Sequence, residues 1–130
     1  MDASQALAEL TELSSQVKRA VVLDASGAIL GATDADAAAA EELAQAALDL
    51  VGAAGDVHAS PDEVARVEVE LAAGGLFVLR EGGLTIAATT GPRPTSGLVA
   101  YDLRTCLRAI DPPARKGRRG ARARTGEGEE

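Results

Sequence analysis

The chain has 130 residues and a formal net charge of −7, a length that suits a single domain. Hydrophobic residues make up 46% of it, but 28 residues are alanine and only 2% are aromatic, so one copy alone would bury little large apolar surface. Residues 1–110 hold 7 basic and 16 acidic side chains, a net charge of −9, which argues against nucleic-acid binding by the folded part.

Cysteine usage and hydropathy narrow the class of protein further. Cys106 is the single cysteine, so no disulfide can form within one chain. The first residues lack the charged and apolar regions of a secretory signal, and no apolar run reaches the roughly 18 residues that a membrane span needs. We therefore expect a soluble cytoplasmic protein.

A first helix is predicted from Asp2, which can cap it with Gln5 in the capping-box position. Its expected buried stripe recurs at helical spacing and consists of Leu7, Leu10, Leu13 and Val17. Lys18 and Arg19 then lie where the helix would end, near its negative dipole end.

A β-hairpin follows directly after this helix. Residues 20–23 are short, apolar and partly β-branched, and residues 28–32 form the expected returning strand. The turn between them, 24–27, includes Gly27, which can adopt the positive φ that such a turn needs. The two runs are too close together for anything but antiparallel pairing.

The second predicted helix spans about residues 36–53, with Thr33 or Asp34 as its cap. Its expected apolar stripe consists of Leu43, Ala47, Leu50 and Ala54. A second stripe at spacing four is polar and consists of Glu41, Gln45 and Asp49. The segment 56–62, which contains His58, is expected to be a loop.

Three strands and a last helix complete the folded part. Residues 64–71 alternate, with valines at 67 and 69 pointing one way and charged residues at 66, 68 and 70 the other. Further strands are predicted over 76–80 and 84–89. The last helix begins after Thr95 or Ser96 and should bury Leu98, Val99, Leu103, Cys106, Leu107 and Ile110, with Arg104 and Arg108 on its polar side. Residues 111–130 are expected to be a disordered charged tail after one domain over 1–110.

The order α-β-β-α-β-β-β-α predicts an α+β fold, in which helices pack on an antiparallel sheet. Three segments of the chain (17–27, 75–79 and 97–104) resemble parts of the roadblock family, which includes dynein light chains and bacterial regulators of Ras-like GTPases. They match that family's first strand and glycine hairpin, its fourth strand, and the start of its last helix.

This resemblance implies a five-stranded antiparallel sheet with helices on both faces. The first and third helices would cover one face and the second helix the other. It also implies a homodimer, in which the third strands of two copies pair edge to edge and the second helices pack together. The joint surface would be a platform for a small GTPase.

The residues themselves also favour self-pairing of the third strand. An uncovered strand such as 64–71 would template aggregation, and pairing about a two-fold axis satisfies it. An axis at Val67 places Arg66 opposite Glu68 of the partner, whereas an axis at Glu68 places two carboxylates together. We therefore predict the Val67-centred register, and an interface formed by Leu43, Ala47, Leu50, Arg66, Val67, Glu68 and Val69.

No catalytic, cofactor or metal site is predicted. The chain contains no P-loop sequence, and its single histidine, His58, has no visible partners for a triad or a metal site. Cys106 is expected to be a packed thiol rather than a nucleophile. Carboxylate pairs near the start of the second helix are explained by capping and by the helix dipole.

Glu41, Gln45 and Asp49 are the predicted partner-binding residues, although a charged helix face can also be simply solvated. The favoured function is a non-catalytic dimeric adaptor or regulator of a Ras-like small GTPase in a bacterial signalling system. Two alternatives stay open. One is a structural scaffold without a GTPase. The other is a nucleic-acid-associated protein that acts through the basic tail, including Arg115, Lys116, Arg118 and Arg119.

Overall fold

The computed structural model describes residues 1–58 and 65–111. The elements follow the predicted order, and their bounds are α1 (Ala3–Leu13), β1 (Val17–Leu23), β2 (Ile29–Ala32), α2 (Ala37–His58), β3 (Arg66–Leu71), β4 (Gly74–Glu81), β5 (Leu84–Thr90) and α3 (Ser96–Ala109). The predicted basic tail and Val64 lie outside the described residues.

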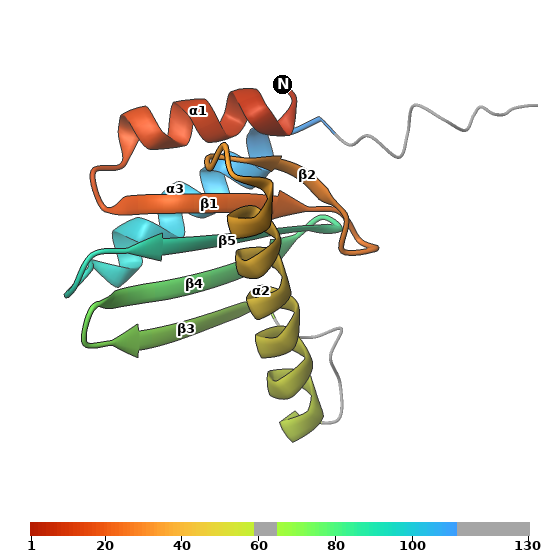
Figure 1. Cartoon of the computed structure of the whole chain (residues 1–130), viewed down its shortest axis with the longest axis vertical. Coiled ribbons are helices and arrows are strands. Elements are labelled where there is room, and N and C mark those ends of the chain that lie inside the picture. The colour runs from red at the N-terminus through yellow and green to blue at the C-terminus, as the bar shows by residue number, and fades with distance from the viewer. Residues whose placement is uncertain (59–64, 112–130) are drawn as a thin grey trace, which may run out of the picture.

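The strands form one five-stranded sheet in the order β2-β1-β5-β4-β3, and every neighbouring pair is antiparallel (Figure 1). The α+β prediction is therefore confirmed. Two strands, β2 and β3, are at the edges of the sheet. The predicted turn at Gly27 is confirmed, since Gly27 has a positive φ. Gly82 and Gly83, in the turn between β4 and β5, have positive φ as well.

The sheet separates two apolar clusters. One cluster joins α1 and α3 to the face that carries Phe77, and the other joins α2 to the face that carries Val78. This arrangement confirms that the first and third helices share one face of the sheet and the second helix covers the other (Figure 1). Alternation of side chains along each strand supplies both layers.

The first helix is shorter than the sequence predicts. Its capping box at Asp2 and Gln5 is confirmed, but the helix ends at Leu13, whose side chain is 75% exposed. The hydroxyl of Ser14 accepts hydrogen bonds from the backbone N–H groups of Gln16 and Val17, which starts an extended chain. Val17 satisfies helical and alternating spacing equally well, and the β-branched run that follows favours the strand.

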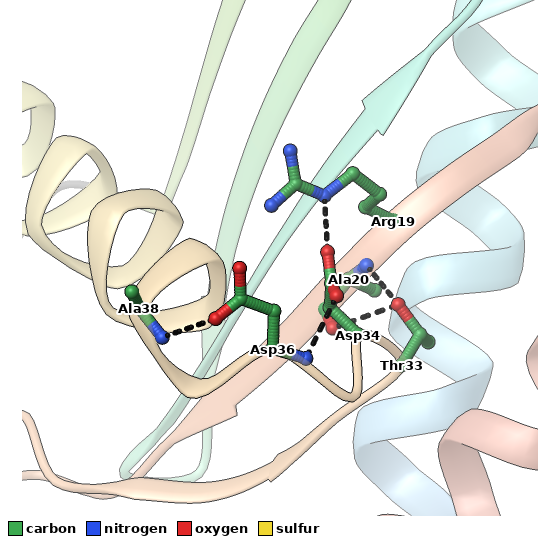
Figure 2. A network of polar contacts seen from close by, with 6 residues as sticks. All are labelled: Arg19, Ala20, Thr33, Asp34, Asp36 and Ala38. Carbon is green, nitrogen blue, oxygen red and sulfur yellow. Dashed lines mark hydrogen bonds and ion pairs between the residues drawn. The ribbon is translucent and has the colours of Figure 1, made fainter.

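The start of α2 also differs from the prediction, as Figure 2 shows. Neither Thr33 nor Asp34 caps the helix. Thr33 accepts the Ala20 N–H at 2.9 Å, and Asp34 pairs with Arg19 through an Nε–Oδ2 distance of 3.0 Å. Asp36, directly before the helix, accepts the Ala38 N–H at 3.0 Å and so takes the capping role.

Two further expectations about the helices are wrong. The second helix continues to His58 instead of ending near residue 53, so residues 56–58 are helical rather than part of a loop. In α3, which follows Thr95 as predicted, Leu98 is half exposed and does not join the buried side. Over the described residues, none of the helices is both long and apolar enough to cross a membrane.

Candidate protein-interaction site

The strand β3 is an open edge of the sheet in the described part of the chain. It pairs with β4 on one side, from Arg66 opposite Leu79 to Leu71 opposite Gly74. The Arg80 N–H donates to the carbonyl of Ala65 at 2.9 Å. Because backbone groups alternate along an antiparallel strand, those of Arg66 and its alternate neighbours point away from β4. The edge therefore offers a row of backbone donors and acceptors to a further strand.

The side chains of β3 divide between the two faces as the sequence predicts. Val67 and Val69 lie opposite Val78 and Leu76, on the α2 face, and both valines are half-buried. Arg66 and Glu68 lie on the other face and are exposed. An Arg66 Nη2–Glu68 Oε1 distance of 3.8 Å makes a loose ion pair within the strand, of the kind that contributes little to stability.

The predicted interface residues of α2 do not all face outward. Leu43 and Ala47 are 8% and 0% exposed, because they pack on the sheet of their own chain. Their side chains therefore belong to the protomer core and offer almost no surface to a second copy. Leu50 is only half-buried and lies at the margin of the same cluster.

The C-terminal part of α2 runs past the edge strand. In Figure 1 the helix crosses the sheet and its last turns extend beyond β3. Val57, in these last turns, is 80% exposed, and Leu71 at the end of β3 is 57% exposed. The open strand edge and the projecting end of α2 thus lie on the same side of the molecule (Figure 1).

The predicted partner-binding stripe lies on the outer face of α2. Glu41, Gln45 and Asp49 are all exposed, and the Gln45 amide donates to Asp49 Oδ1 at 2.9 Å. Beside them is a hollow of about 450 Å³, which Ile29 and Leu48 also line.

Sequence reasoning missed Ile29 and Leu48, which are 38% and 39% exposed. Leu48 follows Glu41 and Gln45 at helical spacing, which is a usable signal, whereas Ile29 reaches the stripe only through the folding of the β1–β2 hairpin.

The thiol of Cys106 is buried, as the sequence predicts. Burial raises the pKa of the Cys106 thiol to about 11, with a smaller contribution from the charge of Glu9, so the thiol is protonated at neutral pH. Within residues 1–58 and 65–111, no three Cys, His, Asp or Glu side chains are grouped so as to hold a metal ion. His58 is the last residue of α2.

Arg104 and Arg108 lie on the polar side of α3, and both reach Glu81 at the β4–β5 turn. The hydrogen bond from Arg108 is the main cause that holds the pKa of Glu81 below its usual value, and the charges of both arginines add to it. These ion pairs therefore link α3 to the end of β4.

Comparisons with known proteins concern the fold. No protein-family model matches the sequence, and no curated protein matches it either. The crystal structure of a Roadblock/LC7 domain from Streptomyces avermitilis matches with a TM-score of 0.71 and 22% identity, over 84% of this chain and 94% of that chain.

Two MglB structures match as well. The gliding protein MglB from Thermus thermophilus has a TM-score of 0.61 and 15% identity, over 83% of this chain and 84% of that one. MglB from Myxococcus xanthus has a TM-score of 0.58 and 15% identity, over 80% and 77%. These likenesses confirm the fold that the three sequence segments imply.

Proposed function

We propose that this chain, which has the roadblock/LC7 fold, is a non-catalytic homodimeric regulator or adaptor of a Ras-like small GTPase. The observation that carries the proposal is the open edge of β3 beside the projecting end of α2. A second copy of the same fold would pair with this edge and cover this end of the helix. The family resemblance supplies the expectation of a GTPase partner.

The geometry of β3 favours one register for the dimer. With the two-fold axis at Val67, Arg66 of each copy faces Glu68 of the other. An axis at Glu68 opposes two identical carboxylates, and an axis at Val69 opposes Glu68 and Glu70. Backbone groups of Arg66 and Glu68 face the open edge, so they would form the hydrogen-bonded pairs of the new ladder.

The dimer also gives the end of α2 a surface to pack on. In a two-fold arrangement about β3, the turns that project past the edge would lie over the sheet of the second copy. Val57 and Leu50 would then lose exposed apolar area, and each fully buried aliphatic side chain contributes about 1.5–3 kcal/mol. This burial offsets the scarcity of large apolar side chains in one copy.

The outer faces of the two α2 helices would form the contact surface for the GTPase. Glu41 and Asp49 provide negative charge there, and Leu48 provides exposed apolar area. A partner with basic and apolar residues at the contact would complement this surface. Regulation would follow if the surface bound one nucleotide state of the GTPase more tightly than the other.

A binding measurement with Ras-like GTPases of the organism that makes this protein tests the proposal. Each GTPase is loaded with GDP or with a non-hydrolysable GTP analogue and titrated with the full chain. We expect tighter binding of one nucleotide state. Glu41→Lys together with Asp49→Lys should weaken this binding at least about tenfold, because both substitutions reverse charge at the contact.

Glu12→Lys is the matched control, since Glu12 is an exposed acid on α1, on the other face of the sheet. It should leave the affinity unchanged. Binding of no GTPase in either nucleotide state, with unchanged GTP turnover, would leave the structural scaffold as the better function.

A further inference from the structure

A groove runs between α1 and α3, on the face of the sheet opposite α2. It encloses a cavity of about 420 Å³, and its lining includes Leu13, Leu98 and Tyr101. The two helices and the sheet beneath them share one buried cluster, so the groove is built on a packed layer. It lies apart from the edge strand and from the outer face of α2.

Three exposed apolar side chains of the described residues are grouped at this groove. Leu13 is 75% exposed, Tyr101 is 65% exposed and Leu98 is 50% exposed. They are three of the seven large apolar residues that are exposed in the described part of the chain. Grouped apolar exposure of this kind marks a surface that another molecule covers, whereas scattered single residues need no explanation.

The charges around the groove have one sign. Glu9 and Asp102 line it, and no basic residue does. Neither carboxylate takes part in a hydrogen bond or ion pair within the described residues. The nearest cations of α3, Arg104 and Arg108, are engaged with Glu81 on another side of the helix. The rim of the groove is therefore acidic, and no basic residue of its lining neutralises the two carboxylates.

We propose that this groove docks a basic amphipathic helix of a partner protein. The lining of α3 runs from Leu98 to Ala109, which at 1.5 Å per residue is about 16 Å, or three helical turns. A helix with apolar residues at positions i, i+3, i+4 and i+7 would cover Leu13, Leu98 and Tyr101. Lysine or arginine on its flanks would face Glu9 and Asp102.

Two other occupants fit the groove less well. The tail 112–130 of this chain has the right charge, but its side chains are alanine, proline, threonine, glycine and charged residues, which cannot cover the apolar lining. A second copy that packed through the same groove would bring the carboxylates of Glu9 and Asp102 from both copies together, which is unfavourable. The chemistry therefore selects a helix that is both apolar and basic.

Binding of a designed peptide to the full chain tests the proposal. The probe is a fluorescent 14-residue peptide with leucine at helical spacing and lysine elsewhere. A peptide with glutamate in place of lysine and a scrambled peptide of the same composition are its references. Fluorescence anisotropy should show that the lysine peptide binds at least about tenfold more tightly than either reference, because only it matches both the apolar and the charged features.

Variants of exposed residues locate the binding. Tyr101→Ser and Asp102→Lys should each weaken binding of the lysine peptide about tenfold, whereas Glu42→Lys, which reverses an exposed acid on α2, should leave it unchanged. Backbone amide shifts in NMR spectra should change in α1 and α3 and stay constant in α2.

Several results would overturn the proposal. Equal binding of the lysine and glutamate peptides, an equal loss with Glu42→Lys, or shift changes confined to α2 would show that the peptide does not recognise the groove. Light scattering that reported assemblies larger than a dimer, dispersed by Tyr101→Ser, would assign the groove to a second copy. Replacement of Arg115, Lys116, Arg118 and Arg119 by alanine should leave the affinity unchanged, and a tenfold rise would identify the tail as the occupant.

Discussion

Glu68 of the edge strand β3 accepts a hydrogen bond from the hydroxyl of Ser96, the first residue of α3. This contact joins the open edge of the sheet to the helix layer beneath it. Because Glu68 is held on the α3 side, Val67 next to it points to the opposite face, among the residues that α2 covers. The charged and apolar positions of the edge are thus fixed within one copy of the chain.

The proposed register predicts which cysteine variants crosslink. Val67→Cys should form a disulfide between two copies under mild oxidation, because Val67 would face itself in a non-hydrogen-bonded pair with Cα atoms about 4.5 Å apart. Glu68→Cys should crosslink poorly, since an axis at Val67 places it opposite Arg66. Non-reducing gels measure the yield. The wild type is the control, because Cys106 is buried and should give no dimer band. Efficient crosslinking at Glu68 with none at Val67 would contradict this register.

The backbone of Thr90 approaches Gly74 so closely that no side chain fits there. A Cβ at Gly74, the first residue of β4, would overlap the carbonyl oxygen of Thr90. Gly74→Ala should lower the free energy of unfolding by about 1–3 kcal/mol, as overpacking generally does. Gly97→Ala is the matched control in α3, where a Cβ meets open space. It should raise stability by about 0.5–1 kcal/mol. Urea denaturation measures both, and an unchanged midpoint for Gly74→Ala would contradict the close approach.

The contact between Glu81 and the two arginines of α3 predicts a pH dependence. The pKa of Glu81 is held below its ordinary value of 4.5, mainly by the hydrogen bond from Arg108. A lowered pKa means that the folded state favours the carboxylate, so this stabilisation is present above pH 4.5 and is lost as the pH falls through the folded-state pKa. Glu81→Gln should therefore lower the melting temperature slightly at pH 7.

The same difference between wild type and Glu81→Gln should shrink as the pH falls below 4.5. Because the contact is exposed, it should also shrink in 1 M salt. Glu70→Gln is the control, since Glu70 is an exposed acid on β3 that takes part in none of the ion pairs found in the described chain. A Glu81→Gln difference that was as large at pH 3 as at pH 7 would assign the effect to packing instead of charge.

Local patterns predict much of this fold because they depend on neighbouring residues. The capping box at Asp2, the positive φ of Gly27 and the alternation of β3 are all confirmed. The end of α1 was not predictable in the same way, because Val17 fits both a helical stripe and an alternating strand. Choosing between the two depends on packing against β5, which is distant in sequence.

The interaction surfaces were harder to predict for a related reason. A helical stripe shows that a helix has an apolar side, but it does not show which neighbour covers that side. Leu43 and Ala47 therefore read as possible contacts with a second copy, whereas they lie in the core of one copy. Leu98 reads as buried, yet it lines the open groove between α1 and α3.

The reactivity of Cys106 reports on the charge at this groove. Burial and, to a smaller extent, Glu9 raise the pKa of the thiol to about 11, so alkylation by iodoacetamide should be slow at pH 8 and should accelerate until about pH 11. Glu9→Gln removes a negative charge that disfavours the thiolate, so it should lower the thiol pKa and speed alkylation at a given pH. Glu12→Gln on the same helix should leave the rate unchanged, because Glu12 does not contribute to the shift. A pH–rate profile measured by mass spectrometry gives the pKa of each variant. A wild-type value near 9, the ordinary value for an unperturbed thiol, would mean that water reaches the floor of the groove freely.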